Sequence, residues 1–276
     1  MIFSKQSGMH EGPIARVGRN SSSSSQSFVH GRLSCPNELI DKVISVTGLT
    51  GQGSLLDLGC GDGRLGIAFA PYAKRVVGVD SDPEMMQVAS ACARDKGVQV
   101  SFRFGEGLPL DNLPGNFHLV TVGSSFRGMD RATTLEALDR IVYPFGALAL
   151  FRDSHPKIPQ NLWYKRLQSA LRPLSQKAPA DSLGEAPVPD EFYLLKSKFD
   201  RLERVSVIQE VESPVERVLH RAWSMAIPRS KQLESEMKTI LDNLRTLLNQ
   251  HANNGLITEV IESEALVAFR SDPSSP

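Results

Sequence analysis

Short apolar runs alternate with longer amphipathic stretches through the middle of the chain. Four of the five runs end in glycine or an acid, as buried strands do when they stop at a turn. The runs are residues 55–58, 76–80, 98–104, 117–123 and 145–151. Helical spacing lies between them, at about residues 64–72, 83–96 and 131–143. This alternation predicts an α/β protein with a doubly wound, mostly parallel sheet.

The helix predicted at residues 83–96 has clear signals at both ends. Asp82 can cap its amino end, and Pro83 suits the first helical position. Glu84 places negative charge near the positive end of the helix dipole. Gly97 can end the helix, because glycine readily adopts the left-handed conformation found after many helices.

Two stretches that flank this region lack a regular hydrophobic pattern. Residues 1–36 are polar and glycine-rich and include the serine run 21–25, so they bury too little apolar surface to hold a fold. We expect a flexible N-terminal arm, or alternatively a lid that becomes ordered when ligands bind. Six prolines lie within residues 152–195, which predicts a helical insertion with loops.

The last quarter of the chain returns to regular patterns. Residues 202–211 predict a strand, and Ser213 to Glu216 form a capping box that should start a helix running to about Met225. Apolar residues at helical spacing predict a further helix at 233–250. The alternating stretch 256–269 predicts a closing strand.

Composition narrows the class of protein. The chain has 276 residues, of which 41% are hydrophobic, and its 31 basic residues balance 31 acidic ones. Without a net positive field, nucleic acid is a poor first candidate for a partner. The sequence contains neither an apolar run long enough to span a bilayer nor a secretory signal, so we expect a soluble, cytoplasmic protein. Three widely spaced cysteines suggest reduced, structural thiols and no metal site.

The strongest chemical signal is the segment 55–65, Leu-Leu-Asp-Leu-Gly-Cys-Gly-Asp-Gly-Arg-Leu. A predicted strand leads into three closely spaced glycines, and a predicted helix follows them. Asp80 ends the next strand, about twenty residues on, where an acid can accept hydrogen bonds from ribose hydroxyls. We therefore expect a nucleoside cofactor at the carboxyl ends of the strands.

Two kinds of nucleoside cofactor compete for such a turn. A dinucleotide needs its pyrophosphate at the positive helix end, with the third glycine three places after the second. Here the third glycine comes two places after the second, and Asp62 puts an anion where the pyrophosphate would lie. S-adenosylmethionine has no phosphate and carries an ammonium and a sulfonium, so it suits an acid-lined turn better.

The sequence resembles the class I S-adenosylmethionine-dependent methyltransferases, most closely the bacterial small-molecule type. Beyond the glycine turn, three further segments are similar to the family: residues 77–86, 104–109 and 117–126. Residues 125–131, Ser-Phe-Arg-Gly-Met-Asp-Arg, are similar to a family segment that carries His-Trp-Met-Asp-Arg, and Arg127 and Gly128 replace its His-Trp pair. Residues 28–39 resemble the family's segment that leads into the first helix and closes over the cofactor.

The resemblance implies cofactor contacts along these segments. The expected positions are Arg32, Asp57, Gly59, Gly61, Asp80, Ser81, Met85, Gly105, Glu106, Gly123 and Ser124. For Asp57 the alternative is to hold backbone amides, and for Met85 it is core packing. Cys60 and His118 are expected to be structural.

Two residues are candidates for acting on the acceptor. His155 follows the fifth strand and is a candidate general base, with a structural histidine as the alternative. Arg127 is a candidate cation facing an anionic acceptor, and the alternative is a surface salt bridge with Asp130.

Together these features predict a Rossmann-like methyltransferase fold, a doubly wound, mostly parallel seven-stranded sheet with a helical cap. We expect a flexible arm at 1–36, a cofactor-binding core at 37–151, an acceptor-cap insertion at 152–200, and strands and helices that complete the sheet and cap at 201–276. The predicted function is S-adenosylmethionine-dependent methyl transfer to the oxygen, nitrogen or carbon of a small molecule, in specialised metabolism, by a monomer or homodimer. The alternatives are an RNA or protein methyltransferase and a cofactor-binding protein that has lost catalysis.

Overall fold

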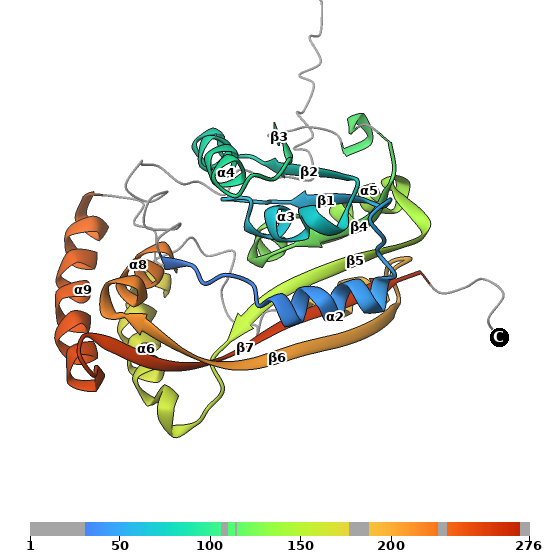
Figure 1. The fold of residues 1–276 in the computed structure, drawn as a ribbon. Helices are drawn as coiled ribbons and strands as arrows, with labels where there is room; N and C mark the ends of the chain where they lie inside the picture. Colours follow the sequence, from blue (N-terminus) through green and yellow to red (C-terminus); the bar gives the residue numbers. More distant parts are fainter. Residues whose placement is uncertain (1–30, 106–109, 114, 177–187, 226–230, 271–276) are drawn as a thin grey trace, which may run out of the picture.

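The computed structural model describes residues 31–105, 110–113, 115–176, 188–225 and 231–270. Their core is a single seven-stranded sheet with the order β3-β2-β1-β4-β5-β7-β6 (Figure 1). Neighbours among β1 to β5 are parallel, and β7 runs antiparallel to both β5 and β6. The strands are β1 (Ser54–Leu58), β2 (Arg75–Asp80), β3 (Ser101–Phe104), β4 (Phe117–Val122), β5 (Val142–Ser154), β6 (Arg201–Pro214) and β7 (Leu256–Phe269). This confirms the predicted doubly wound, mostly parallel seven-stranded sheet.

Helices cover both faces of the sheet. Residues of α2 (Asn37–Thr47) and α3 (Arg64–Phe69) pack in one hydrophobic cluster, while residues of α5 (Arg131–Ile141) and α7 (Asp190–Leu195) pack in another. In β1, Leu55 joins the first cluster while Leu56 and Leu58 join the second. Successive strand side chains point to opposite faces, so one unbroken apolar run supplies both cores.

The predicted signals of α4 (Pro83–Asp95) are confirmed. The Asp82 carboxylate accepts hydrogen bonds from the amides of Glu84 and Met85, and Pro83 is the first helical residue. Gly97 follows with φ 66°, a left-handed conformation that costs glycine little.

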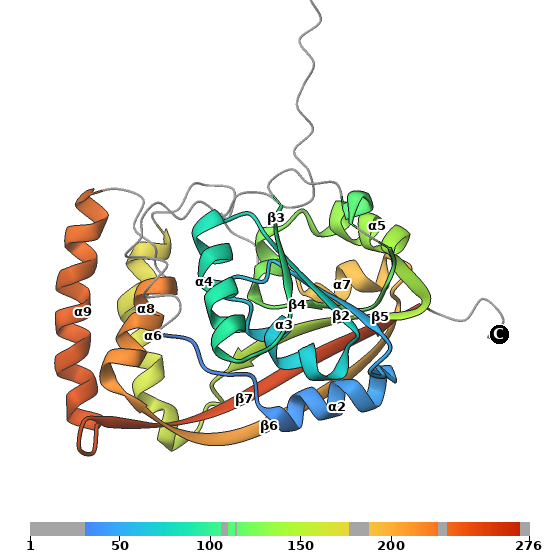
Figure 2. The same ribbon diagram turned by 45° about the horizontal axis from the view of Figure 1, so that its top comes forward.

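A group of three helices stands beside the far end of the β6–β7 ribbon (Figure 2). They are α6 (Leu162–Gln176), α8 (Val215–Met225) and α9 (Lys231–His251). Their apolar residues form a separate cluster that includes Trp163, Val218, Met237 and Leu248. We call this group the cap. The carboxyl ends of the parallel strands point toward it in Figure 1.

The capping box predicted at Ser213 is wrong. Ser213 still belongs to β6, where it pairs with Ile257, and its hydroxyl donates to the Glu259 carboxylate. Glu216 pairs with Arg245 of α9 instead of returning to the start of α8. The sequence pattern was correct for a helix start, but burial beside Glu259 gave the serine a stronger acceptor.

Four short helical turns also lie within the described residues. They are η1 (Ala70–Tyr72), η2 (Leu110–Asn112), η3 (Ser124–Gly128) and η4 (Pro159–Asn161). The proposed arm at 1–36 lies outside the described residues up to residue 30, and the domain boundaries at 36, 151 and 200 remain predictions.

Candidate functional site

The glycine turn lies between β1 and α3, at the carboxyl end of the sheet. Gly59, Gly61 and Gly63 have φ values of 65°, 55° and 77°, which side-chain-bearing residues rarely adopt. The amides of Gly59 and Cys60 donate to the Val79 carbonyl of the neighbouring strand, at 2.8 and 3.0 Å. The turn is therefore anchored to β2, the strand that ends in Asp80.

Close approach is a second reason for glycine in this turn. A Cβ at Gly59 would lie 2.4 Å from the Ser125 hydroxyl, and one at Gly63 would lie 2.7 Å from the Phe102 ring. By contrast, a Cβ at Gly123 would meet only Leu65, at 3.8 Å, so the carboxyl end of β4 has room beside the turn.

Asp80 connects the turn to the start of α4. One carboxylate oxygen accepts from the Gly61 amide at 2.7 Å, and the other accepts from the Asp82 amide at 3.0 Å. The Asp80 carbonyl accepts from the Gly105 amide at 2.8 Å, which places that glycine beside the same site. Asp80 therefore joins the turn, the start of α4 and Gly105, and a carboxylate in this place can accept hydrogen bonds from ribose hydroxyls.

Asp57 occupies a different environment from the one expected of a cofactor contact. Only 1% of the residue is exposed, and its two oxygens accept from the Gly66 amide at 2.9 Å and the Thr121 hydroxyl at 3.1 Å. Burial raises the pKa of this carboxyl to about 7, against the lowering effect of the two hydrogen bonds. The geometry favours the alternative role, in which Asp57 holds α3 and β4 beneath the turn.

Asp62 carries a charge that is compensated inside the turn, contrary to the expectation from the sequence. Asp62 is 4% exposed and pairs with Arg64, whose Nε lies 3.0 Å from one carboxylate oxygen and whose Nη2 contacts the other. Its charge is therefore compensated locally, and repulsion of a pyrophosphate is weaker than the sequence indicated. The same guanidinium also donates to the Leu33 carbonyl.

Residues 31–36, which we call the lead-in segment, run from α8 toward α2 past the ends of the strands (Figure 1). Arg32 donates from Nη2 to the Ser124 hydroxyl at 2.7 Å, so two predicted site residues 92 positions apart meet. Burial and the carboxylate of Asp153, at the end of β5, raise the pKa of the Cys35 thiol to about 12. The segment thus crosses the region where the crevice of a doubly wound sheet lies.

Some of the other predicted cofactor positions lie beside the site, and others are buried in the core. Gly123 and Ser124 follow β4, and Ser81, 8% exposed, follows Asp80. Met85 is fully buried, which favours its alternative role in core packing. Glu106 lies outside the described residues.

His155 is not placed as a general base would be. Its side chain is 6% exposed, and its Nε2 lies 2.9 Å from the carboxylate of Glu259, which is itself completely buried. The imidazole stacks on Tyr164 with 3.8 Å between ring centroids. These contacts favour the structural alternative, because one ring nitrogen is occupied and the ring is enclosed.

Arg127 lies in the last turn of η3, and 62% of its side chain is exposed. Its Nε lies 3.6 Å from the carboxylate of Asp190 at the start of α7. The expected alternative partner, Asp130, instead caps α5 by accepting from the Thr133 amide. The structure does not bring Arg127 and His155 together, and the geometry favours a tether to α7 over an acceptor contact.

The sequence analysis missed a buried group centred on Glu259. Besides His155, Arg221 contacts this carboxylate at 2.7 Å, and Ser213 donates to it. Burial alone would raise the pKa of Glu259, but these three partners lower it below its ordinary value. One feature of the sequence could have indicated this group: Glu259 is an acid at an inward-facing position of the alternating stretch 256–269.

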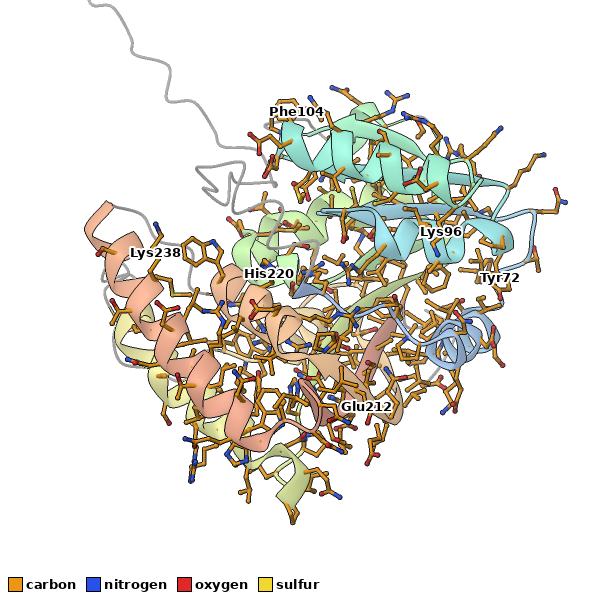
Figure 3. The ribbon with its side chains drawn as sticks, turned by 60° about the vertical axis from the view of Figure 1, so that its left-hand side comes forward. Tyr72, Lys96, Phe104, Glu212, His220 and Lys238 are labelled. Carbon is orange, nitrogen blue, oxygen red and sulfur yellow. The ribbon has the colours of Figure 1, made fainter. Side chains whose placement is uncertain are left out.

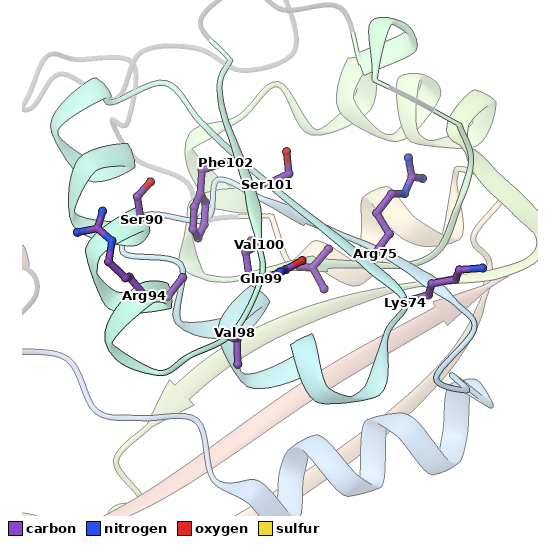
Figure 4. A pocket seen from close by; sticks show the side chains of 11 residues that line it. Lys74, Arg75, Ser90, Arg94, Val98, Gln99, Val100, Ser101 and Phe102 are labelled. Atoms are coloured by element: carbon purple, nitrogen blue, oxygen red, sulfur yellow. The ribbon is translucent and has the colours of Figure 1, made fainter.

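One feature away from the turn is a cavity at the opposite end of the sheet. A cavity of about 540 Å³ lies at the amino ends of β2 and β3, lined by residues such as Lys74, Val100 and Arg94, at the opposite end of the sheet from the glycine turn (Figure 4). In the described ranges, no cluster of three histidine, cysteine or acidic residues could hold a metal ion. None of the described helices is long and apolar enough to cross a membrane.

The comparisons agree with this geometry. A family model described as a methyltransferase domain matches residues 55–146. An uncharacterised methyltransferase of Bacillus subtilis, YcgJ, is 40% identical over 68 residues, which are 24% of this chain and 27% of that protein. A demethylmenaquinone methyltransferase of Thermus thermophilus is 34% identical over 106 residues, 37% of this chain and 48% of that protein. The chain thus spans less than half the length of these curated relatives.

Solved structures share the fold. The Bacillus subtilis YcgJ structure has a TM-score of 0.51 at 19% identity, covering 86% of this chain and all of that one. A methyltransferase from Thiobacillus denitrificans, solved with S-adenosyl-L-homocysteine, has a TM-score of 0.52 at 17% identity, covering 94% and 99%.

The sheet order and the glycine turn define a Rossmann-like protein whose ligand site lies at the carboxyl ends of its parallel strands. Residues 55–146 of the chain match a methyltransferase domain, the type of domain that the sequence resemblance implied, and the fold is shared with a methyltransferase solved with S-adenosyl-L-homocysteine.

Proposed function

We propose that the protein transfers the methyl group of S-adenosylmethionine to a small-molecule acceptor. The observation that carries this proposal is the glycine turn held against Asp80, in a domain that the methyltransferase family model matches. The donor set fits the cofactor, because the turn offers backbone amides and a carboxylate to the nucleoside, and the Arg64 guanidinium beside it is paired with Asp62. The bound cofactor would supply an electrophilic methyl group on a sulfonium.

The residues of the chain would hold and align the two reactants. Asp80 would accept from the ribose hydroxyls, the turn at 59–63 would support the nucleoside, and the open end of β4 at Gly123 would accommodate the methionine part. Arg32 and Ser124 would exclude water above this site. Alignment of this kind contributes on the order of 7 to 11 kcal/mol to a bimolecular transfer.

The part of the chain that would bind the acceptor lies outside the matched domain. The family model ends at residue 146, before the cap. Relatives named for ubiquinone and menaquinone biosynthesis support a small-molecule acceptor, but they match only about a third of the chain. Since the cap lies outside the matched domain, we propose an acceptor of specialised metabolism. Cytoplasmic location and a monomeric or homodimeric state remain predictions.

The test is calorimetric binding of S-adenosylhomocysteine to the parent and to Asp80→Ala. We expect the variant to lose about 1.5 to 3 kcal/mol of binding free energy, roughly a 10- to 150-fold weaker Kd, because it loses charge-assisted hydrogen bonds. Asp95→Ala, an exposed carboxylate at the other end of α4, is the control and should bind like the parent. Equal affinity in parent and Asp80→Ala would remove Asp80 from the site.

Turnover needs a separate measurement. Incubation with labelled S-adenosylmethionine and a metabolite library, read by mass spectrometry, should give a methylated product. Cofactor binding without any product across a broad library would favour the alternative of a protein that has lost catalysis.

A further inference from the structure

The Glu259 carboxylate fastens three elements of the molecule at one buried point. It contacts His155 after β5 at 2.9 Å and Arg221 of α8 at 2.7 Å, and it accepts from Ser213 at the end of β6. Glu259 has no exposed surface. A buried carboxylate is stable only while such partners compensate it, so this group holds α8 in one place on the ribbon.

The lead-in segment packs against the same part of α8, at Gly31. A Cβ at Gly31 would lie 2.5 Å from the backbone nitrogen of Arg221 and 2.8 Å from the carbonyl carbon of His220. Both neighbours are helix backbone, which cannot rotate away as a side chain can. Figure 3 labels His220 on α8, between α9 and the glycine-turn end of the sheet. Only glycine therefore allows the segment to lie this close to the helix.

The next two residues reach the cofactor side. Arg32 contacts Ser124 at the end of β4 at 2.7 Å, and the Leu33 carbonyl accepts from Arg64. Arg64 in turn contacts Asp62 inside the glycine turn at 3.0 Å. A continuous set of contacts thus runs from the buried Glu259 carboxylate of β7, through α8 and the lead-in segment, to the glycine turn.

We infer that Glu259 and Gly31 are positioning residues for the cofactor site, which they reach through the lead-in segment. The inference rests on the proposed function. Any shift of α8 moves the backbone against which Gly31 packs, and this changes the contacts of Arg32 and Leu33. Because such coupling is reciprocal, occupation of the turn and placement of the cap favour each other. This provides a route by which an acceptor under the cap strengthens cofactor binding.

The experiment is a double-mutant cycle with S-adenosylhomocysteine as the probe. Gly31→Ala and Glu259→Gln should each weaken its binding three- to tenfold by calorimetry. The double variant should bind no more than about twofold worse than the weaker single variant, because both changes break the same connection. Gly51→Ala is the matched control, since a Cβ there has no neighbour within 4 Å, and it should bind like the parent.

A second readout separates positioning from general destabilisation. Amide hydrogen exchange at residues 59–63 should quicken in Gly31→Ala without ligand, while the amides of β4 and β5 keep their protection. If Glu259→Gln does not fold, Arg221→Lys replaces it in the cycle. The inference is overturned if Gly31→Ala binds within twofold of the parent, or if the two effects multiply. A parent that fails to bind the probe would instead contradict the proposed function.

Discussion

Asp57 lies one residue before the end of β1 and Asp80 ends the neighbouring β2, yet the two carboxylates have different surroundings. Asp57 is enclosed and both oxygens serve the protein, whereas Asp80 is half-buried at the edge of the turn. Desolvation raises the pKa of Asp57 to about 7, so the group titrates near neutral pH. A carboxyl at the end of a buried strand can therefore be a support or a ligand, and its exposure decides which.

Asp57 gives a prediction about stability and pH. Its pKa is about 7 in the folded state against 3.8 unfolded, so the folded protein holds a proton that the unfolded chain has lost between these values. Stability should therefore fall as pH rises from about 4 to 7, by up to about 1.4 kcal/mol per pH unit, and then level off. Asp57→Asn keeps the shape and removes the titration.

Urea unfolding of the parent and Asp57→Asn at several pH values between 4 and 8 measures this effect. The free energy of unfolding of the parent should decline relative to the variant across that window. A difference that stays constant with pH would show that Asp57 is ionised throughout.

At the scale of elements, α7 is held by arginines from two neighbouring elements, η3 and α5. Arg131, at the start of α5, donates to the Val188 carbonyl and to Asp190 and lies 4.0 Å over the Tyr193 ring. Arg127 makes only the longer, exposed contact with Asp190. The two arginines of one short segment thus differ in how much of α7 they hold.

We expect Arg131→Ala to lower the free energy of unfolding by about 1 to 3 kcal/mol, because several hydrogen bonds and a ring contact are lost together. Arg127→Ala should cost at most about 1 kcal/mol, as exposed pairs do. Urea denaturation compares them. If Arg127→Ala destabilises as much as Arg131→Ala, the tether is misassigned. An Arg127→Ala enzyme with at least tenfold lower kcat/KM for its acceptor would restore the acceptor-facing role.

At the scale of the whole molecule, charge bears on the choice of partner. The 31 basic and 31 acidic residues leave no net charge. Several arginines are also paired with carboxylates: Arg131 with Asp190, Arg204 with Glu264, and Arg270 with Asp139. The chain therefore has no net excess of cations to neutralise phosphates and release counterions, which is what drives binding to nucleic acid.

The protein should not bind RNA or DNA appreciably at physiological salt. Fluorescence anisotropy with a labelled RNA duplex and a DNA duplex at about 0.15 M salt tests this, with S-adenosylhomocysteine both present and absent. Sub-micromolar binding that weakens steeply with added salt would favour the RNA methyltransferase alternative.

The sequence by itself determined the core and its cofactor turn. Apolar runs buried on both faces, helix signals such as Asp82-Pro83, and closely spaced glycines are local patterns whose physics acts over a few residues. They predicted the strands, most helix bounds, and the places of Gly59, Gly61 and Asp80. They could not separate a buried Asp57 from an exposed one, because exposure depends on what α3 and β4 bring against it.

Only the tertiary structure decided which residues that are distant in the sequence form hydrogen bonds and ion pairs. Glu259 meets His155 across 104 positions, Arg32 meets Ser124 across 92, and Asp190 draws Arg127 away from its neighbour Asp130. No periodicity encodes such pairs, since each depends on how separate elements pack. The contacts of His155 and Arg127 followed from that packing, because a buried charge requires a partner, and the fold alone determines which partner lies within reach.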